Sequence, residues 1–354
     1  MAIRIGIVGC GAIANLHAAS YQKLGDRVEH VACCDVEKER ADAFVERYGF
    51  KKSYSDEKQM LEECELDAVS VCTWNSQHKP CTMLALDAGV NVLCEKPMAM
   101  NTAEALEMEE GARRNGKLLM IGFVRRHGND AATALDIINK GYLGDIYCAK
   151  VSYLRRAGFP GNWFGDKSYS GGGPLIDLGV HVIDLSRYLC GNPKPVTVFG
   201  ATFSKLGARK NLKSVVLPWE STSDVKKKEY KFDVEDFVTA MIRFDNGLLV
   251  TAEASFSLNI EKDTGNVELL GTKAGLTLSP FVLHTECNDM LADTVIRANI
   301  GEGDFFRAEM ENFVNAIEGI APCKAPAEDG VELMRILDAI YESAETGKSV
   351  DIVR

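Results

Sequence analysis

Residues 3–20, IRIGIVGCGAIANLHAAS, decide the fold of the first part of this chain. A short apolar run leads into the pattern Gly9-Cys10-Gly11-Ala12-Ile13-Ala14, and a helical pattern follows at once. Gly9 permits a tight turn, Gly11 lets a phosphate approach the backbone, and Ala14 lets the helix pack close to the strand. Free amides at the helix start attract anions. The stretch therefore predicts a strand, a phosphate loop and a helix that bind a dinucleotide.

The second strand pattern supports this interpretation, because it ends at an acid. Asp35 lies about 20 residues beyond the glycine loop, where a carboxylate binds the ribose hydroxyls of adenosine. A carboxylate there also repels a 2′-phosphate, so the sequence predicts NAD rather than NADP. Lys38 and Arg40 are close enough to weaken this preference, and we include Arg40 among the expected cofactor contacts. The alternative is a chance glycine turn followed by a surface aspartate.

Strand and helix patterns alternate as far as residue 123, which predicts parallel βαβ units in an N-terminal Rossmann domain. The expected strands are Ile3 to Val8, Val28 to Cys34, Ala68 to Thr73, Asn91 to Cys94 and Leu118 to Ile121. The expected helices are Ile13 to Leu24, Glu37 to Tyr48, Asp56 to Glu62, His78 to Ala88 and Thr102 to Asn115, the last between an Asn101-Thr102 start and a Gly116 stop.

From residue 124 the pattern changes to longer strands with fewer helices, which predicts an α+β domain with an open, mostly antiparallel sheet. Its expected strands are Ile146 to Leu154, Val196 to Phe203, Asp236 to Phe244, Leu248 to Ser257 and Asn266 to Gly271. Its expected helices are Asp130 to Asn139, Pro174 to Leu189, Phe305 to Ile317 and Asp329 to Ala344. We expect domains at 1–123 and 124–354, and the last helix is a candidate to pack back on the first domain. Residues 205–231 form an expected surface excursion, and Lys226-Lys227-Lys228 a solvated loop.

Composition narrows the class of protein. The 354 residues exceed the length of one typical domain, and the net charge of -11 argues against nucleic acid or an anionic membrane as a partner. No apolar run approaches the roughly 20 residues that cross a bilayer, and the first residues enter a strand directly. The eleven cysteines include no C-x-x-C pair, and Cys33-Cys34 would point to opposite faces of a strand. We therefore expect free thiols, a cytoplasmic location and a small-molecule partner.

Two further strand ends carry polar residues at the edge where open α/β sheets bind ligands. Glu95-Lys96-Pro97 follows the fifth expected strand, and the proline restricts the backbone at Lys96. An ammonium there can stabilise charge on a substrate oxygen, although an ordinary surface lysine is the alternative. Thr73, Trp74, Asn75 and His78 follow the preceding strand and are expected to face the nicotinamide. We interpret His78 as a cofactor or loop contact rather than a proton-transfer group.

The stretch from Gly171 to Asp184, GGGPLIDLGVHVID, carries the proton chemistry. Asp177 and His181 are four residues apart and share a helical face, and Asp184 lies near it. A carboxylate can hold the imidazole in one tautomer and stabilise its charged form, as a general base for an alcohol proton requires. The alternative is a helix-stabilising pair, but a nicotinamide domain needs a base nearby.

A polar and aromatic cluster precedes the glycines. It consists of Arg155, Arg156, Asn162, Trp163 and Asp166. Such residues suit stacking on a sugar and hydrogen bonding to it, and we expect Arg155 and Trp163 to bind substrate; ordinary loop packing is the alternative. No histidine or carboxylate cluster has metal-ligand spacing, so we expect no metal.

Together these features make the chain similar to the glucose-fructose oxidoreductase/inositol dehydrogenase family, Gfo/Idh/MocA. The resemblance covers nearly the whole chain. The residues that carry it are Gly9 to Ala14, Asp35, Thr73 to His78, Glu95-Lys96-Pro97, Gly122-Phe123 with Arg125-Arg126, and the D-x-G-x-H of Asp177, Gly179 and His181.

The resemblance implies an NAD-dependent oxidoreductase of a sugar, cyclitol or glycoside, including a glycoside 3-dehydrogenase, and a homodimer or homotetramer built through the C-terminal sheet. It implies a catalytic trio in which His181 is the acid/base, Asp177 orients it or binds substrate, and Lys96 polarises the reacting oxygen. Glu95 and Arg125 join the expected cofactor contacts.

Departures from the family pattern leave the substrate open. Trp74 stands where many members have proline, and Val124 and His127 replace residues that are often polar and aromatic. Two other classes also fit an NAD-binding chain of this kind: a glycoside hydrolase that oxidises its substrate transiently, and a sensor that binds NAD without turnover. A cofactor that stays bound and is recycled between two sugars is a further possibility.

Overall fold

The computed structural model describes residues 2–209, 212, 231–296 and 303–353. The chain divides into two compact units, residues 1–127 with 304–331 and residues 128–303 with 332–354. Most of the expected excursion at 205–231, including the lysine loop at 226–228, lies outside the described residues.

The first unit contains β1 (Ile3–Val8), α1 (Ala12–Gln22), β2 (Val28–Cys34), α2 (Lys38–Tyr48), β3 (Lys52–Tyr54), α3 (Glu57–Glu63), β4 (Ala68–Val71), α4 (His78–Asp87), β5 (Asn91–Cys94), α5 (Thr102–Asn115), β6 (Leu119–Ile121) and α9 (Phe305–Ile317), with short 3-10 turns at Gly25–Arg27, Asn75–Gln77 and Val124–His127. The expected strands and helices of this part are present, and the short β3 is an addition that the sequence pattern did not predict.

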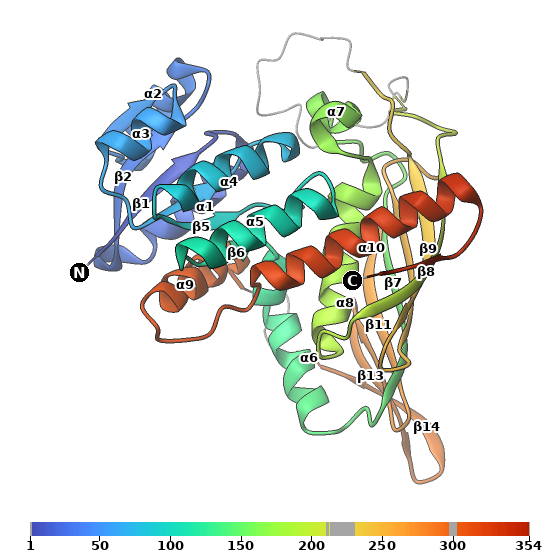
Figure 1. Cartoon of the computed structure of the whole chain (residues 1–354). Coiled ribbons are helices and arrows are strands. Elements are labelled where there is room, and N and C mark those ends of the chain that lie inside the picture. The colour runs from blue at the N-terminus through green and yellow to red at the C-terminus, as the bar shows by residue number, and fades with distance from the viewer. Residues whose placement is uncertain (1, 210–211, 213–230, 297–302, 354) are drawn as a thin grey trace. The chain divides into compact units, whose positions relative to one another are not determined.

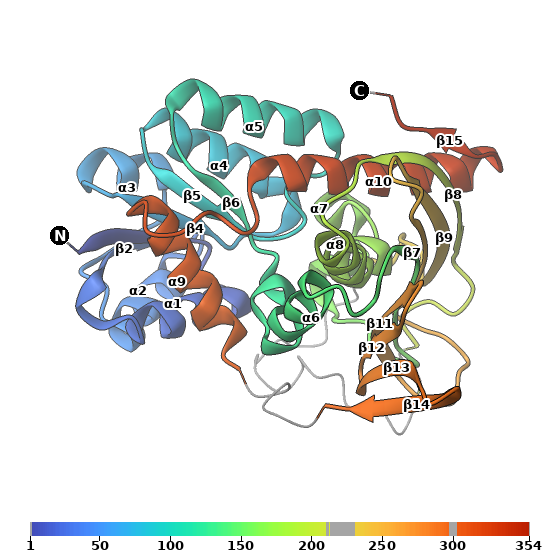
Figure 2. The same cartoon turned by 90° about the horizontal axis from the view of Figure 1, so that it is seen from below.

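The strands of the first unit form one parallel sheet in the order β3-β2-β1-β4-β5-β6. Helices α4 and α5 lie on one side of this sheet, and α1, α2 and α9 lie on the other (Figures 1 and 2). The direction of the strand order reverses between β1 and β4, and such a switch point is where open parallel sheets bind ligands. The predicted Rossmann domain is confirmed.

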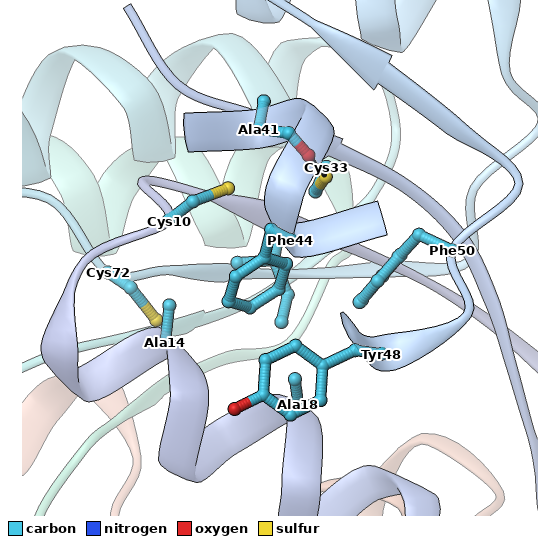
Figure 3. Close-up of a cluster of buried hydrophobic side chains, with 10 residues drawn as sticks. Cys10, Ala14, Ala18, Cys33, Ala41, Phe44, Tyr48, Phe50 and Cys72 are labelled. Atoms are coloured by element: carbon cyan, nitrogen blue, oxygen red, sulfur yellow. Dashed lines mark hydrogen bonds between the residues drawn. The ribbon is translucent and has the colours of Figure 1, made fainter. Parts of the chain in front are cut away.

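The phosphate loop is anchored in the core of this sheet. Cys10 and Ala14 belong to a buried cluster in which α1 packs against Phe44 and Tyr48 of α2 (Figure 3). Ala14 is fully buried, which fits its predicted part in close packing of helix and strand. The eleven cysteines all lie within the described residues and are free thiols, and Cys33 is among the buried ones.

Residues 304–331 pack with the first unit, so the division differs from the expected cut at 123/124. The physical reason is the amphipathic helix α9, which buries Met310, Phe313 and Val314 and packs against α1. Helix α9 and the first residues of the last helix therefore belong to the first unit, together with the N-terminal part of the chain. The boundary at 123/124 stays a prediction for the functional domains.

The second unit contains α6 (Asn129–Asn139), β7 (Ile146–Leu154), α7 (Lys167–Ser170), the π-helical turn η5 (Leu175–Gly179), α8 (Val180–Leu189), β8 (Pro195–Phe203), β9 (Phe237–Phe244), β10 (Leu249–Ser255), β11 (Thr264–Gly271), β12 (Gly275–Leu278), β13 (Phe281–Cys287), β14 (Met290–Val295) and β15 (Val350–Asp351), with a 3-10 turn at Asn162–Gly165. The helix α10 (Ala327–Thr346) begins in the first unit and continues in the second.

Nine strands form the second sheet in the order β14-β13-β12-β11-β7-β10-β9-β8-β15. The pair β7 and β10 is parallel, and the other described pairs are antiparallel, which confirms the predicted mostly antiparallel sheet. Helix α8 packs on β7, β10 and β11 of this sheet (Figure 2). Among the described residues, no helix combines the length and apolar character needed to span a bilayer.

The expected helix from Pro174 to Leu189 is split into two kinds of turn. Residues Leu175–Gly179 form a π-helical turn, and regular α-helix begins at Val180. A π-turn holds more residues than an α-turn, and such turns often occur at functional sites. The irregular turn lies between the glycine loop and His181, so it sets the direction in which this helix starts.

Candidate active site

The phosphate loop has the geometry that each small residue was predicted to allow. Gly9 has a φ of +86°, and a Cβ there would lie 2.8 Å from the carbonyl oxygen of Cys72 at the end of β4. A Cβ on Gly11 would meet nothing within 4 Å, and no side chain caps the start of α1. Open backbone at Gly11 and uncapped amides fit an incoming pyrophosphate.

Asp35 is held at the end of β2 by the loops that it joins. It is buried, and its carboxylate accepts the amide of Cys10 at 2.8 Å and the amide of Glu37 at 2.9 Å. Arg40 lies 3.5 Å from the same carboxylate and also pairs with Glu37. The acid is therefore fixed beside the glycine loop, where the sequence predicted it to bind ribose.

His78 connects the turn after β4 to the turn after β5. One ring nitrogen of His78 lies 2.7 Å from the carbonyl oxygen of Pro97, and the other lies 3.3 Å from that of Thr73. Burial lowers the pKa of this histidine. The imidazole thus ties two strand ends together, in keeping with its interpretation as a loop contact.

The hydroxyl of Thr73 is buried without a hydrogen-bond partner among the described residues. It lies at the same sheet edge as Gly11, so its position also fits a bound cofactor. Trp74 is half-buried beside it, and Asn75 starts the following 3-10 turn.

The Glu95-Lys96-Pro97 turn is built on a buried hydrogen bond between Glu95 and His17. Glu95 Oε1 lies 2.9 Å from Nε2 of His17 on α1, and Oε2 accepts the amide of Lys96 at 3.1 Å. Burial acts to raise the pKa of Glu95, but the hydrogen bond and charge of His17 outweigh it, so the pKa lies below its usual value. The carboxylate fixes the backbone from which the half-buried Lys96 side chain starts.

Sequence patterns missed the part played by His17, because it lies 78 residues from Glu95. The signal that was available is a histidine on the helix that follows a phosphate loop. Gly122 shares this environment, since a Cβ there would lie 3.2 Å from Oε1 of Glu95.

The two arginines after Phe123 have different surroundings. Arg126 is buried, pairs with Asp329 at 2.7 Å and lies over the ring of Phe123. Arg125 is half-buried against the ring of Phe305, 5.7 Å from its centroid. The Arg126 side chain therefore serves packing inside the unit, whereas part of the Arg125 side chain is accessible to solvent.

In the second unit, Asp177 and His181 are both half-buried on the η5–α8 segment. The amide of Asp177 donates to the carbonyl oxygen of Gly173 at 3.1 Å. Asp184 is 1% exposed, so it differs from the other two and faces the interior. A Cβ on Gly179 would lie 3.2 Å from Cδ1 of Leu175 and 3.4 Å from Cβ of Ala254 on β10, so the backbone between the two candidate catalytic residues packs closely on the sheet.

Two of the predicted substrate-binding residues, Arg155 and Trp163, also lie in the second unit. The guanidinium of Arg155 lies over the ring of Tyr153, and it donates to the hydroxyl of Tyr153 at 3.2 Å and to Asp263 at 3.2 Å. The ring of Tyr153 lies 6.4 Å from that of His181. Tyr153 was missed in the sequence, although it lies near the end of β7, two residues before Arg155.

Trp163 is half-buried and stacks on Phe164, with ring centroids 4.0 Å apart. The part of Trp163 in substrate binding stays a prediction. Among the described residues, no group of three or more metal-ligating side chains could hold a metal ion.

Comparison with known proteins identifies the class. Residues 3–123 match the oxidoreductase family model with an NAD-binding Rossmann fold, and residues 131–277 match the GFO/IDH/MocA C-terminal domain. The chain belongs to the GFO/IDH/MocA family and is an NAD-dependent oxidoreductase.

Individual relatives narrow the comparison further. D-glucoside 3-dehydrogenase of Escherichia coli (strain K12) is 36% identical, and the match covers 99% of this chain and 97% of that protein. Levoglucosan dehydrogenase of Pseudarthrobacter phenanthrenivorans is 26% identical over 99% of this chain and 98% of that protein. A solved levoglucosan dehydrogenase in complex with NADH has a TM-score of 0.85 at 23% identity and covers both chains fully, which shows the shared fold.

Proposed function

We propose that this protein is an NAD-dependent dehydrogenase of a sugar or glycoside, with the C3 hydroxyl of a glucoside as the preferred reacting group. The observation that carries the proposal is the 36% identity to a D-glucoside 3-dehydrogenase over 99% of the chain. A second relative is named for a sugar-derived substrate, levoglucosan, over a similar length.

The residues of the first unit fit the cofactor. Gly9 and Gly11 lie in a loop that is open at Gly11, and Ala12, Ile13 and Ala14 form the uncapped first turn of α1. When bound, NAD supplies the acceptor for the hydride of the substrate. We assign this loop to the pyrophosphate of the cofactor.

We assign Asp35 to the adenosine ribose, with Arg40 beside it. Thr73, Trp74, Asn75 and His78 are proposed contacts after β4, and Glu95, Lys96 and Arg125 are proposed contacts after β5 and β6. For His78 and Glu95 the contact is through the backbone that they fix, because their side-chain atoms already bond within the unit.

The proton chemistry is assigned to Lys96, Asp177 and His181. Oxidation of a secondary alcohol to a ketone releases one hydride and one proton, and a general base must take the proton. We assign His181 as this base, Asp177 as the carboxylate that orients it or binds substrate, and Lys96 as the cation that stabilises charge on the reacting oxygen.

Arg155 and Trp163 are the proposed substrate-binding side chains, and Tyr153 joins them. Arg155 is fixed by Tyr153 and Asp263, and the ring of Tyr153 lies 6.4 Å from that of His181. A planar guanidinium and an indole ring suit the hydroxyls and the apolar face of a sugar ring.

The test is a panel of sugars, polyols and glycosides with NAD, read at the nicotinamide absorbance and run with and without a keto-sugar acceptor. Net NADH formation with a glucoside is the expected result. Cleavage of the glycoside without net NADH would assign the chain to the transient-oxidation hydrolases. NADH binding without turnover of any substrate would contradict the proposal and favour a sensor.

We also propose a homodimer or homotetramer that pairs through the C-terminal sheet. Phe199 and Met241 are 49% and 47% exposed, and they are cross-strand partners on β8 and β9, so they share one face of that sheet. Exposed apolar side chains on one sheet face are typical of a protein interface. Light scattering at several concentrations tests the assembly, and a monomer throughout would contradict it.

A cytoplasmic location is proposed from the eleven free cysteines, because unpaired thiols persist in a reducing compartment. Fractionation of the producing cell tests this proposal, and recovery outside the cytoplasm would overturn it.

A further inference from the structure

We propose that Glu235 is a positioning residue for Asp177 and His181, because it holds the turn from which their helix starts. The inference rests on the proposed function of that pair. Glu235 lies two residues before β9 and outside every motif that the sequence predicted to be functional.

Glu235 is buried and has three hydrogen-bond donors around its two carboxyl oxygens. Oε2 accepts the amide of Gly173 at 3.0 Å, and Oε1 accepts the amide of Leu175 at 3.2 Å. The hydroxyl of Tyr341 on α10 donates to Oε1 at 2.9 Å. Each oxygen therefore acts as an acceptor, and two of the donors are backbone groups at the start of the η5 turn.

The peptide groups of Gly173 connect this carboxylate to the catalytic segment. The amide of Gly173 donates to Glu235, and its carbonyl oxygen accepts the amide of Asp177 at 3.1 Å. Leu175, the second backbone donor, is the first residue of η5. A shift of Glu235 would thus move the backbone at Asp177 through one intervening residue.

The glycine run has a structural reason that the sequence analysis did not give. A Cβ on Gly172 would lie 1.9 Å from the hydroxyl of Tyr341, and a Cβ on Gly173 would lie 2.2 Å from the carbonyl oxygen of Glu235. These two glycines allow close approach to the protein's own side chain and backbone. The approach brings the carboxylate of Glu235 within reach of the turn.

The neighbouring acids show that Glu235 belongs to a segment specialised in binding loop amides. Asp233 accepts the amide of Lys167 at the start of α7 at 2.8 Å. Asp236 accepts the amides of Leu206 and Gly207. Within residues 233–236, Glu235 is the acid that reaches the glycine loop before the catalytic helix.

The direct test is Glu235→Gln, which keeps the shape of the side chain. Whichever way the new amide is turned, its NH₂ group faces the N–H of Gly173 or of Leu175, so one backbone donor loses its acceptor. Displacing a catalytic group by about 1 Å can cost about 100-fold in rate, so we expect kcat to fall by about tenfold or more. The affinity for NADH should not change, because the cofactor loop lies in the other unit.

Two variants serve as matched controls. Tyr341→Phe removes one donor but leaves both backbone amides of the turn paired, so kcat should fall by less than about threefold. Asp245→Asn makes the same carboxylate-to-amide change in the turn after β9, where Asp245 accepts the amide of Lys194 at 3.0 Å. We expect wild-type kcat for Asp245→Asn.

Hydrogen exchange read by mass spectrometry tests the inference without any turnover. In Glu235→Gln, peptides covering residues 171–184 should exchange faster than in wild type, and in Asp245→Asn they should not. Tyr341→Phe should give a smaller increase in the exchange rate of the same peptides. If Glu235→Gln does not fold, this variant tests the inference instead.

Unchanged kcat or unchanged exchange at residues 171–184 in Glu235→Gln would overturn the inference. An equal loss of kcat and NADH affinity would also overturn it, since that result indicates general damage. Absence of turnover in the wild-type protein would instead contradict the proposed function, and the exchange experiment would then decide on Glu235 alone.

Discussion

Glu309 in the first unit and Glu235 in the second are both buried carboxyl groups, but their surroundings differ. Glu235 accepts hydrogen bonds from Gly173, Leu175 and Tyr341. Neither carboxyl oxygen of Glu309 has a hydrogen-bond partner among the described residues. Burial raises the pKa of both groups, although the two amides act against this at Glu235, whereas the charge of Glu95 raises the pKa of Glu309 further.

The difference shows two ways to bury a carboxyl group. At Glu235 donors surround an acceptor, so the group can hold the backbone in a fixed direction. At Glu309 burial without a hydrogen-bond donor among the described residues raises the pKa, which favours the neutral form. We therefore expect Glu235 to fix the position of the η5 turn in the second unit. In the first unit, we expect the free energy of unfolding to depend on the protonation state of Glu309.

The largest expected effect tests whether both units contribute to the chemistry. His181→Ala in the second unit and Lys96→Ala in the first should each lower kcat by about 10²- to 10⁴-fold, because each removes a group used in proton transfer or charge stabilisation. Steady-state kinetics and a fluorescence titration with NADH measure turnover and binding separately. His284→Ala on β13, where the imidazole pairs with Asp293 at 2.7 Å, is the control and should keep its activity. Unimpaired turnover in either main variant would refute that assignment.

The next effect concerns the cofactor alone. Asp35→Asn removes the charge beside the glycine loop and weakens a charge-assisted hydrogen bond to ribose, so KM for NAD should rise by about 10- to 100-fold. Relative use of NADP should also rise, because the repulsion of a 2′-phosphate is lost. Asp87→Asn, which alters an exposed acid at the end of α4, is the control. Equal efficiency of the wild-type protein with both cofactors would contradict the predicted preference for NAD.

Glu309→Gln tests the pH dependence of stability in the first unit. An unfolded glutamate releases its proton near pH 4.3, whereas folded Glu309 keeps its proton to higher pH because burial raises its pKa. The wild-type free energy of unfolding should therefore fall as pH rises above about 4, by up to about 1.4 kcal/mol per pH unit, until the folded pKa is reached. Glu309→Gln removes this contribution, so its stability relative to wild type should increase with pH.

Denaturant unfolding between pH 4 and 8 measures this difference in slope. Glu311→Gln on the same helix changes a side chain that is 44% exposed, and it should keep the wild-type slope within error. A wild-type slope in Glu309→Gln would mean that Glu309 is ionised in the folded protein.

The smallest effect is expected at the substrate loop. Trp163→Ala removes a ring worth about 0.5–1.5 kcal/mol in stacking, so KM for the sugar should rise by about 3- to 10-fold with little change in kcat. Phe164→Leu is a comparison that keeps an apolar neighbour while altering the observed ring stack. An unchanged KM in Trp163→Ala would remove Trp163 from the substrate-binding residues.

Sequence patterns predicted the local features well, since those features depend on neighbouring residues. Helix α5 begins after Asn101, whose side chain accepts the amide of Glu104, and it ends at Gly116 in a left-handed conformation. The glycine loop and Asp35 were found for the same reason, because a strand, a turn and an acid follow each other at fixed spacing.

The contacts that fix the candidate site could not be predicted in this way. Glu235 lies 62 residues from Gly173, and His17 lies 78 residues from Glu95. Such pairs meet because of strand order and crossover connections, which hydrophobic periodicity does not report. The π-helical turn at Leu175–Gly179 was likewise hidden, since its residues have the same apolar pattern as a regular helix.

The first unit also has a consequence for how the protein is made, because its chain is interrupted. Helix α9 packs on α1, yet residues 128–303 are synthesised between residue 127 and the segment that carries α9. During translation the face of α1 that α9 will cover must wait until the second unit has largely emerged. The cofactor-binding half, although it is made first, is thus completed late, and Glu309 is among the last of its buried groups to arrive.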